Sequence, residues 1–433
     1  MKNSFTTTGL SESMLTLVDQ LHFKQPTDIQ TQAIPDIIND KNIIGESQTG
    51  SGKTHAYLLP LVDKINREKQ EVQVVLTAPT RELAIQIHEE VKQIVRYLAE
   101  EEVIKSRLVI GGLDRKRMMK QLENKPQIII GTPGRILDMV HEGVLSIYQA
   151  SSFVIDEADL MVELNFLESI DELLVRAKTD IQILVFSATI PQQLKPFFKK
   201  YLDQPQHIKI DESITPDTLS HHMIALKHKS LSEKVAQLSE IIQPYVALIF
   251  VNSKETANQL RDELQSRGIR AGLLHGGLTS RERTRTVKAI NELKYEYIVA
   301  TDLASRGIDI KGTSHVINAE LPKELDFYIH RSGRTARAGL SGSVFSLYTE
   351  EDASFIQLLE TKGFPLEFND IHKGELVQAK RLNKRSSRQP VETDMDREAW
   401  KHVKKPQKVK PGYKKRMKQE QARIKHQMKK KKK

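Results

Sequence analysis

The chain has 433 residues, of which 39% are hydrophobic and 28% charged, so it can form two or three packed domains and is not disordered throughout. It has no cysteine and no run of about 18 apolar residues, and acidic residues interrupt its first thirty positions. These features argue against disulfides, cysteine nucleophiles, membrane spans and a secretion signal, and a reducing cytoplasm is the expected compartment. The net charge of +10 comes from the last 54 residues, where 22 basic and 5 acidic residues give +17, while the preceding 379 residues carry −7.

In the first half of the sequence, short apolar runs alternate with helical stretches, a pattern typical of parallel α/β sheets. The expected strands are Asn42–Gly45, Val72–Ala78, Arg107–Ile110, Gln127–Ile130, Phe153–Ile155 and Gln182–Phe186. In an open parallel sheet, ligands bind outside the carboxyl ends of the strands. The residues that follow each run are therefore the candidates for a functional site.

The second half repeats this alternation. Its expected strands are Ala247–Val251, Ala271–Leu274, Tyr297–Ala300, His315–Ile317 and Val344–Leu347. Pro205 and Pro216 lie between the halves, together with three aspartates. We therefore expect an α/β fold with two doubly wound parallel-sheet domains at residues 1–205 and 219–365. A linker at 206–218 would join them, and a largely disordered basic tail would occupy 366–433.

The residues after the first run match a phosphate-binding loop, with serine in place of its first glycine. They are Ser47, Gln48, Thr49, Gly50, Ser51, Gly52, Lys53 and Thr54, followed by an expected helix at His55–Ile65. Glycines let backbone N–H groups surround the phosphates, Lys53 would reach the β- and γ-phosphates, and the Thr54 hydroxyl would bind Mg²⁺. The spacing predicts a nucleotide site.

An acidic group, Asp156-Glu157-Ala158-Asp159, follows the Phe153–Ile155 run. An acidic residue at a strand end beside a phosphate loop is the usual second Mg²⁺ ligand, and an adjacent carboxylate can orient and deprotonate the attacking water. We predict Asp156 as a metal ligand and Glu157 as the catalytic base.

The second half contains three arginines within seven positions, in the segment from His330 to Arg337, and has no phosphate loop of its own. Hydrolysis of a γ-phosphate needs positive charge in the transition state, often from an arginine supplied across an interface. Arg334 and Arg337 could share one helical side and reach the nucleotide if the halves close together. The residues alone leave open whether they complete an ATP site or form a basic RNA-facing helix.

Taken together, these motifs resemble the DEAD-box family of ATP-dependent RNA helicases, in particular its bacterial cold-shock members, over about residues 1–365. The resemblance implies two RecA-like domains and assigns Arg334 and Arg337 as arginine fingers. It also implies adenine contacts by Phe5 and Gln30. Asp28 and His22 stand where the family more often has proline and glycine.

The resemblance further implies nucleotide contacts by Gly307 and Asp309, and coupling of hydrolysis to domain movement by Asp159, Ser187, Thr189 and His330. The RNA contacts that it implies are Pro79, Thr80, Arg81, Gly111, Gly112, Thr132, Arg135, Asn252, Gly276, Arg283 and Thr301. Ser280 stands where the family usually has glutamine. Hydroxyls, glycine backbones and single arginines suit phosphate and sugar oxygens, so we expect binding without sequence preference. The preference for RNA over DNA depends on the resemblance.

The resulting hypothesis is an RNA helicase that closes on ATP and RNA together, opens short duplexes locally and reopens after hydrolysis. An ATP-gated RNA clamp or scaffold, acting in RNA decay or ribosome assembly, would carry the same motifs and is the alternative.

The basic tail has few large aliphatic residues and ends in five lysines, so it cannot bury enough apolar surface to offset the entropy of ordering. We expect it to tether the enzyme to RNA electrostatically, with Trp400 and Tyr413 as candidate base-stacking residues. Residues 366–379 could be a short docking segment or the start of this tail.

Overall fold

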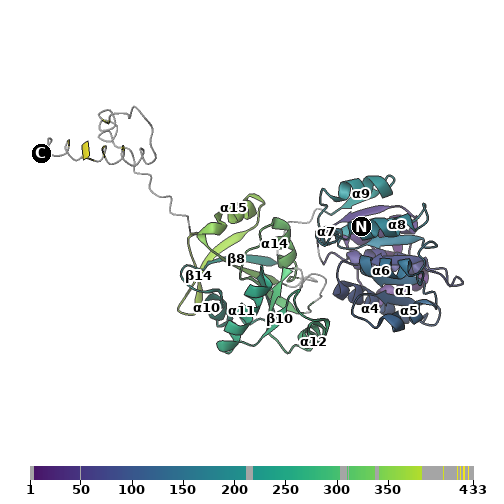
Figure 1. Cartoon of the computed structure of the whole chain (residues 1–433), viewed down its shortest axis with the longest axis horizontal. Coiled ribbons are helices and arrows are strands. Elements are labelled where there is room, and N and C mark those ends of the chain that lie inside the picture. Colours follow the sequence, from purple (N-terminus) through teal and green to yellow (C-terminus); the bar gives the residue numbers. More distant parts are fainter. Residues whose placement is uncertain are drawn as a thin grey trace. The chain divides into compact units, whose positions relative to one another are not determined.

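The computed structural model describes residues 4–48, 50–210, 218–302, 310, 312–336 and 341–382, and isolated positions between 403 and 428. The chain divides into two units after Arg381. The larger unit contains two β-sheets, each with its own helices (Figure 1). Trp400, Tyr413 and most of the expected tail lie outside the described residues. Within the described part, no helix combines the length and the apolar character needed to cross a membrane.

The first sheet has seven parallel strands in the order β3-β4-β2-β5-β6-β1-β7. The strands are β1 Ile43–Glu46, β2 Val74–Thr77, β3 Ser106–Val109, β4 Ile128–Gly131, β5 Ser152–Ile155, β6 Gln182–Ser187 and β7 Gln206–Lys209. All six expected runs form strands here. Their side chains alternate between two hydrophobic clusters: Val154 belongs to one cluster, whereas Phe153 and Ile155 belong to the other.

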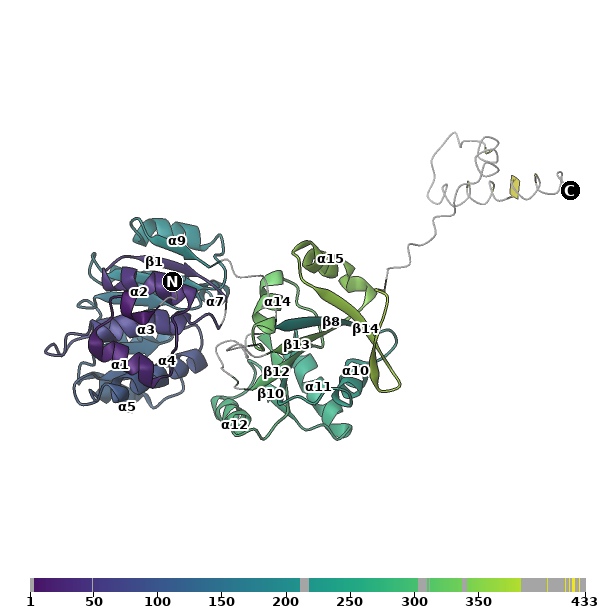
Figure 2. The same ribbon diagram turned by 180° about the vertical axis from the view of Figure 1, so that it is seen from behind.

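Helices cover both faces of this sheet, which makes the first domain doubly wound as expected. One cluster receives side chains from α1 Glu12–Gln20, α2 Asp28–Ile38, α3 Lys53–Asp63 and α4 Arg81–Tyr97. The other receives them from α5 Arg115–Leu122, α6 Pro133–His141, α7 Ala158–Glu163, α8 Leu167–Val175 and α9 Leu194–Tyr201. A short 3₁₀ helix, η1 Phe5–Thr7, precedes them. Figure 1 shows α6 and α8 in front of the sheet, and Figure 2, seen from behind, shows α2 and α3.

The second sheet has eight strands in the order β10-β11-β9-β12-β13-β8-β14-β15, all parallel except the β14–β15 hairpin. They are β8 Leu219–Ala225, β9 Val246–Val251, β10 Ala271–Leu274, β11 Tyr297–Thr301, β12 Thr313–Asn318, β13 Gly342–Tyr348, β14 Leu366–His372 and β15 Glu375–Gln378. The described helices are α10 Leu231–Ser239, α11 Lys254–Ser266, α12 Ser280–Asn291, α14 Leu325–Ser332, the 3₁₀ helix η2 Glu350–Asp352 and α15 Ala353–Thr361. One face of the sheet packs against α10 and α11.

The structure differs from the expected boundaries at both ends of the second half. The expected linker begins inside β7, which pairs with β1 and so belongs to the first domain. The expected tail begins with β14 and β15, which extend the second sheet. The buried ammonium group of Lys234 lies 3.1 Å from the Asp370 carboxylate of β14, and this pair fixes the hairpin to α10. β7 is an edge strand of the first sheet, and the β14–β15 hairpin forms one edge of the second. Ile208 is the only fully buried residue of these three strands, so neither segment has a clear apolar run.

Two residues that depart from the family pattern have a local explanation. Asp28 is the first residue of α2, a position that favours a negative charge and also favours proline. His22 follows the C-cap of α1 with φ 59°, and its N–H donates to the carbonyl of Asp19 at 2.9 Å. This left-handed conformation is the one for which glycine is preferred, so the histidine is tolerated at a cost in stability.

Candidate functional site

The predicted phosphate loop connects the carboxyl end of β1 to α3. Gly50 and Gly52 have φ of 87° and 92°, left-handed values that glycine adopts without strain. The hydroxyls of Ser47 and Ser51 lie 2.7 Å apart, and the Ser51 hydroxyl also donates to the carbonyl of Gln48 at 2.8 Å. Ser47, which replaces a glycine of the pattern, thus fits the loop. Thr49 lies outside the described residues.

Lys53 is the first residue of α3, and only 6% of it is exposed. Its ammonium group donates to the backbone carbonyls of Ser47 at 2.5 Å and Gln48 at 2.9 Å. The charge is therefore held against the loop, at the positive end of a helix. This combination of a lysine, a helix N-terminus and loop N–H groups is suited to a phosphate.

Asp156 follows β5 and is buried. The Tyr57 hydroxyl donates to one of its carboxylate oxygens at 2.8 Å, and the Glu157 backbone N–H donates to the other at 2.9 Å. Burial raises the pKa of Asp156 and the Glu157 carboxylate raises it further, whereas Tyr57 and Lys53 lower it. Tyr57 also interacts with the Thr54 side chain. The two expected metal ligands, Thr54 and Asp156, therefore both lie near the Tyr57 hydroxyl. A bound cation would stabilise the buried Asp156 carboxylate in its ionised form.

Glu157 has φ 50° and ψ 55°, a left-handed conformation that costs a residue with a Cβ atom about 1–2 kcal/mol. It precedes α7, and the chain turns sharply here between β5 and the helix. As a result Asp156 is buried, while the neighbouring Glu157 is partly exposed. Backbone strain of this kind concentrates at functional positions, which agrees with the predicted role of Glu157.

The four predicted coupling residues meet at one place. The backbone N–H of Asp159 donates to the Ser187 hydroxyl at 3.0 Å, and the Thr189 hydroxyl donates to the Asp159 carboxylate at 3.3 Å. His330 Nε2 lies 3.3 Å from the same Asp159 oxygen. This cluster connects α7 of the first domain with α14 of the second. One side-chain N or O atom each of Glu157, Asp159 and His330 lie within 4.8 Å of one another, so the cluster adjoins the predicted base.

The two predicted adenine contacts have protein partners in the structure. Gln30 accepts the Thr27 N–H at 3.0 Å and donates to the Gly52 carbonyl at 3.1 Å, so its amide connects α2 to the phosphate loop. Phe5 is 6% exposed and belongs to the first domain's hydrophobic core. Adenine recognition by either residue stays a prediction.

Sequence reasoning missed the role of a buried arginine, Arg331. Arg331 is 1% exposed, and its guanidinium donates to both carboxylate oxygens of Asp302, at 2.5 and 2.7 Å. It also donates to Asn318, Asn252 and the Glu320 carbonyl, at 3.2, 2.9 and 2.7 Å. Arg331 therefore fixes the ends of β9, β11 and β12 to α14. Its partners lie 11 to 79 positions away in the sequence, so no local spacing indicated its role.

The predicted arginine fingers follow α14. Arg334 is buried, with 8% of it exposed. Arg337 lies outside the described residues, as do Gly307 and Asp309.

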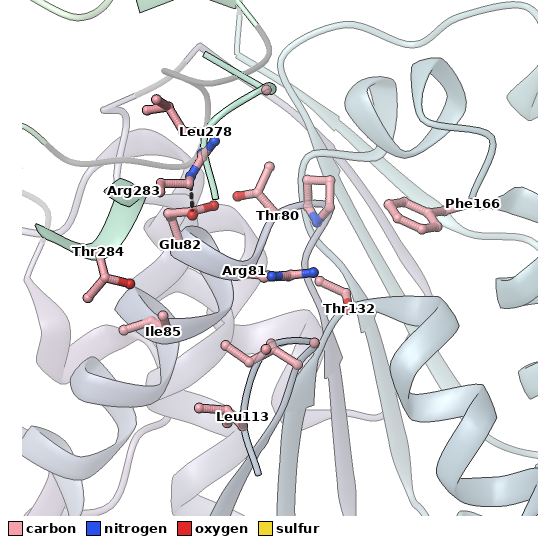
Figure 3. A pocket seen from close by; sticks show the side chains of 15 residues that line it. Thr80, Arg81, Glu82, Ile85, Leu113, Thr132, Phe166, Leu278, Arg283 and Thr284 are labelled. Carbon is pink, nitrogen blue, oxygen red and sulfur yellow. Dashed lines mark hydrogen bonds and ion pairs between the residues drawn. The ribbon is translucent and has the colours of Figure 1, made fainter. Parts of the chain in front are cut away.

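A pocket of about 520 Å³ brings together most of the predicted RNA contacts (Figure 3). Residues of both domains line it. The predicted members are Pro79, Thr80, Arg81, Gly111, Gly112, Thr132, Gly276 and Arg283. We call this the shared pocket. Three predicted contacts, Arg135, Asn252 and Thr301, are not among the residues that line it.

Two of these three have protein partners. Arg135 pairs with Asp138 at 3.1 Å. The Asn252 amide donates to the Leu321 carbonyl at 2.9 Å and its oxygen accepts from Arg331. Thr301 is the last residue of β11 and is partly exposed.

Inside the shared pocket, Arg283 of α12 forms an ion pair with Glu82 of α4 (Figure 3). Both side chains are less than one fifth exposed, so this contact between the domains is largely shielded from water. A Cβ atom at Gly111 would lie 2.8 Å from the Arg81 guanidinium, the flexible end of that side chain, so a larger residue at this position would displace Arg81 within the pocket.

Comparison with known proteins gives consistent results. The model of the DEAD/DEAH box helicase family matches residues 27–197, and the helicase conserved C-terminal domain matches residues 233–339. A DEAD-box ATP-dependent RNA helicase CshB from Bacillus subtilis is 46% identical, over 96% of this chain and 95% of that protein. A CshB from Listeria monocytogenes is 42% identical, over 96% of each chain.

Solved structures agree with this similarity. Dbp5 from S. cerevisiae bound to RNA and ADP BeF3 has a TM-score of 0.75 and 28% identity, over 85% of this chain and 95% of that one. Mss116p bound to ssRNA and AMP-PNP has a TM-score of 0.71 and 24% identity, over 82% of this chain and 76% of that one. The second likeness supports the fold alone.

Proposed function

Because this chain belongs to the DEAD-box family of ATP-dependent RNA helicases, we propose that it binds ATP and RNA in one closed arrangement of its two RecA-like domains. The chain is an RNA helicase that hydrolyses ATP, and the clamp or scaffold alternative is not favoured. The observation that carries the proposed mechanism is the Asp159–His330 contact, which connects the catalytic end of β5 to the second domain.

For ATP, we assign the phosphates to the loop at 47–54 and to Lys53. Glu157 would orient the attacking water and accept its proton, because it is partly exposed and adjoins the buried Asp156. Arg334 and Arg337 would stabilise the charge that develops on the γ-phosphate. Each domain would then contribute groups that the other lacks.

For Mg²⁺, the donor set fits the ion. Thr54 offers a hydroxyl and Asp156 a buried carboxylate, which are hard oxygen ligands of the kind that Mg²⁺ prefers. When bound with ATP, the ion would neutralise phosphate charge. The Tyr57 hydrogen bond would hold the Asp156 carboxylate in position.

For RNA, the shared pocket offers hydroxyls, backbone N–H groups and the guanidinium of Arg81. These groups suit phosphate and sugar oxygens, so we propose binding without sequence preference, through the backbone. A strand held along this surface could not keep a regular duplex partner, and a short duplex would open locally.

Coupling between the two ligands follows from the contacts between the domains. The Asp159–His330 contact lies beside the ATP groups, and the Glu82–Arg283 pair lies within the shared pocket. If both contacts belong to the closed arrangement, ATP and RNA stabilise the same state. Each ligand must then raise the affinity for the other by the same factor.

For the cellular setting, we propose a cytoplasmic enzyme that acts on messenger or ribosomal RNA during cold stress, in ribosomal or RNA-decay complexes. The supporting features are the CshB relatives and the concentration of basic charge in the last 54 residues, which would add an electrostatic tether to RNA.

The experiment that tests the function compares ATP hydrolysis by the full chain with single-stranded RNA, matched DNA or no nucleic acid. We expect stimulation by RNA well above that by DNA, together with ATP-dependent separation of a short RNA duplex. Equal stimulation by both strands would refute RNA specificity. ATP hydrolysis without strand separation would favour the clamp.

The experiment that tests the mechanism replaces His330 by alanine. Asp159 would then lose its partner across the domains, and we expect RNA-stimulated hydrolysis to fall by at least tenfold while nucleotide affinity persists. His141→Ala is the matched control, because His141 also faces a carboxylate, that of Glu172, but is about half exposed. Wild-type stimulation in the His330 variant would rule out the proposed coupling.

A further inference from the structure

The shared pocket contains apolar side chains that a phosphate cannot use. Ile85 and Leu113 line it and are 43% and 46% exposed, and Leu278 and Phe166 line it as well. Phosphate oxygens need hydrogen-bond donors, whereas these four side chains offer only carbon. Their natural partners on a nucleic-acid strand are ribose carbons and base faces. The pocket is therefore suited to a nucleoside as well as to the backbone that its polar residues would hold.

Phe166 is the aromatic residue among those that line the pocket. In Figure 3 it lies on one side, while Ile85 and Leu113 lie on the other and Thr132 lies between them. The side chain is half-buried and packs against the hydrophobic cluster under α6 and α8. The ring is thus held in place by the core and still reaches the pocket. A held aromatic ring is the kind of group that contacts nucleosides without sequence preference.

Phe166 also lies at the opposite end of α7 from the catalytic carboxylates. Glu157 precedes this six-residue helix, and Asp159 belongs to its first turn. At the other end, the Phe166 N–H donates to the Met161 carbonyl at 2.9 Å, and Asn165 takes a left-handed φ of 57°. The six residues of α7 and the turn that follows it therefore connect the pocket to the groups predicted to activate water.

We propose that Phe166 contacts the nucleoside part of the bound RNA strand and that α7 passes this contact to Glu157 and Asp159. The inference rests on the proposed function, because it needs RNA in the shared pocket. RNA would hold the carboxyl-terminal end of α7 in place, and the Asp159–His330 contact would hold its other end. The position of Glu157 between strand β5 and the helix would then depend on bound RNA. Phe166 is thus a positioning residue, and it accounts for part of the stimulation of hydrolysis by RNA.

The test uses the full chain with Phe166→Leu, Phe166→Tyr and the control Phe198→Leu. Leucine keeps apolar packing against the core but removes the ring, and tyrosine restores the ring. Phe198 packs against the same cluster but does not line the pocket, so its leucine variant reports on lost packing alone. Three quantities are measured: the affinity for a labelled single-stranded RNA, the slope of that affinity against salt, and the ratio of RNA-saturated to basal ATP hydrolysis.

We expect Phe166→Leu to weaken RNA binding about fivefold or more. The slope of the affinity against salt should stay unchanged because no charge is lost. The ratio of RNA-saturated to basal ATP hydrolysis should fall. Phe166→Tyr and Phe198→Leu should stay close to wild type. Wild-type RNA affinity in Phe166→Leu would overturn the nucleoside contact, and a weaker affinity with an unchanged hydrolysis ratio would overturn its transmission through α7. An equal loss in Phe198→Leu would show that packing alone was responsible and would also overturn the proposal. A wild-type chain that RNA does not stimulate would instead refute the proposed function.

Discussion

Replacement of Arg331 by methionine tests whether this buried arginine holds the second domain together. Methionine keeps the packing of the aliphatic part of the side chain but lacks the guanidinium, which now lies over the Phe250 ring at 5.2 Å. The change removes the charge and all five hydrogen-bond donors. The Asp302 carboxylate then loses both of its bonds from Arg331, and the buried Asn318 oxygen loses one.

The expected cost follows from the burial of these groups. Asp302 is 18% exposed and Asn318 is fully buried, so water can replace the lost bonds only in part. Removal of one partner from a buried ion pair costs about 3–5 kcal/mol. Whole domains are stable by only about 5–15 kcal/mol, so the second domain would lose a large share of its stability.

Hydrogen exchange read peptide by peptide measures this loss, because it reports on the two domains separately. Amides of β9, β11 and β12 should exchange at least about a hundredfold faster in Arg331→Met, since each 1.4 kcal/mol corresponds to a factor of ten. Amides of β5 and β6 in the first domain should be unaffected. The control is Arg261→Met, because Arg261 pairs with Asp262 at the surface and such pairs contribute about 0–1 kcal/mol. A change below tenfold in the second domain would refute the reasoning.

Four further predictions follow from single features of the chain. Glu157→Gln should abolish multiple-turnover ATP hydrolysis while ATP-dependent RNA binding persists; a loss of RNA binding measured by fluorescence anisotropy would contradict the role as base. Burial opposes ionisation of Asp370, but hydrogen bonds from Lys227 and Lys234 outweigh this effect and lower its pKa to about 2. The ionised Asp370 carboxylate therefore stabilises the fold above about pH 4, and this contribution to stability is lost as the pH falls towards 2. Between pH 4 and pH 2, the urea midpoint of Asp370→Asn should therefore fall less than that of the wild-type chain. His22→Gly should raise stability by about 0.5–1 kcal/mol, because it relieves a left-handed residue, and an unchanged urea midpoint would argue against strain there. Truncation after Leu382 should leave nucleotide affinity unchanged, weaken RNA binding and flatten its salt dependence, and an unchanged salt series would contradict a tethering tail.

The strands that sequence could predict are the ones buried on both faces. Val74–Thr77 and Ile128–Gly131 are continuous apolar runs because helices cover both sides of the first sheet. The missed strands have a different pattern. In β7 only Ile208 is buried. The strand β8 contains two histidines, and the fully buried one, His221, forms a hydrogen bond with the Tyr328 hydroxyl. A buried polar residue with a distant partner gives no apolar signal in the local sequence.

The same distinction applies to the site. Residues of contiguous motifs could be predicted, because spacing along the chain encodes the phosphate loop and the acidic group after β5. Arg331, Tyr57 and Glu82 could not be assigned in this way. Each of them acts on a residue far away in sequence: Tyr57 and Asp156 are 99 positions apart, and Glu82 and Arg283 are 201 apart. Only the fold brings these partners together.

The two contacts between the domains differ in what they can do. His330 and Asp159 are almost fully buried and form part of a hydrogen-bonded cluster, so this contact is suited to position groups beside the predicted ATP site. Arg283 lines the shared pocket and already pairs with Glu82. A phosphate that approaches Arg283 must therefore either join this pair or replace the carboxylate. Because the same guanidinium forms the domain contact and would form the predicted RNA contact, we expect domain closure and RNA binding to be coupled through Arg283.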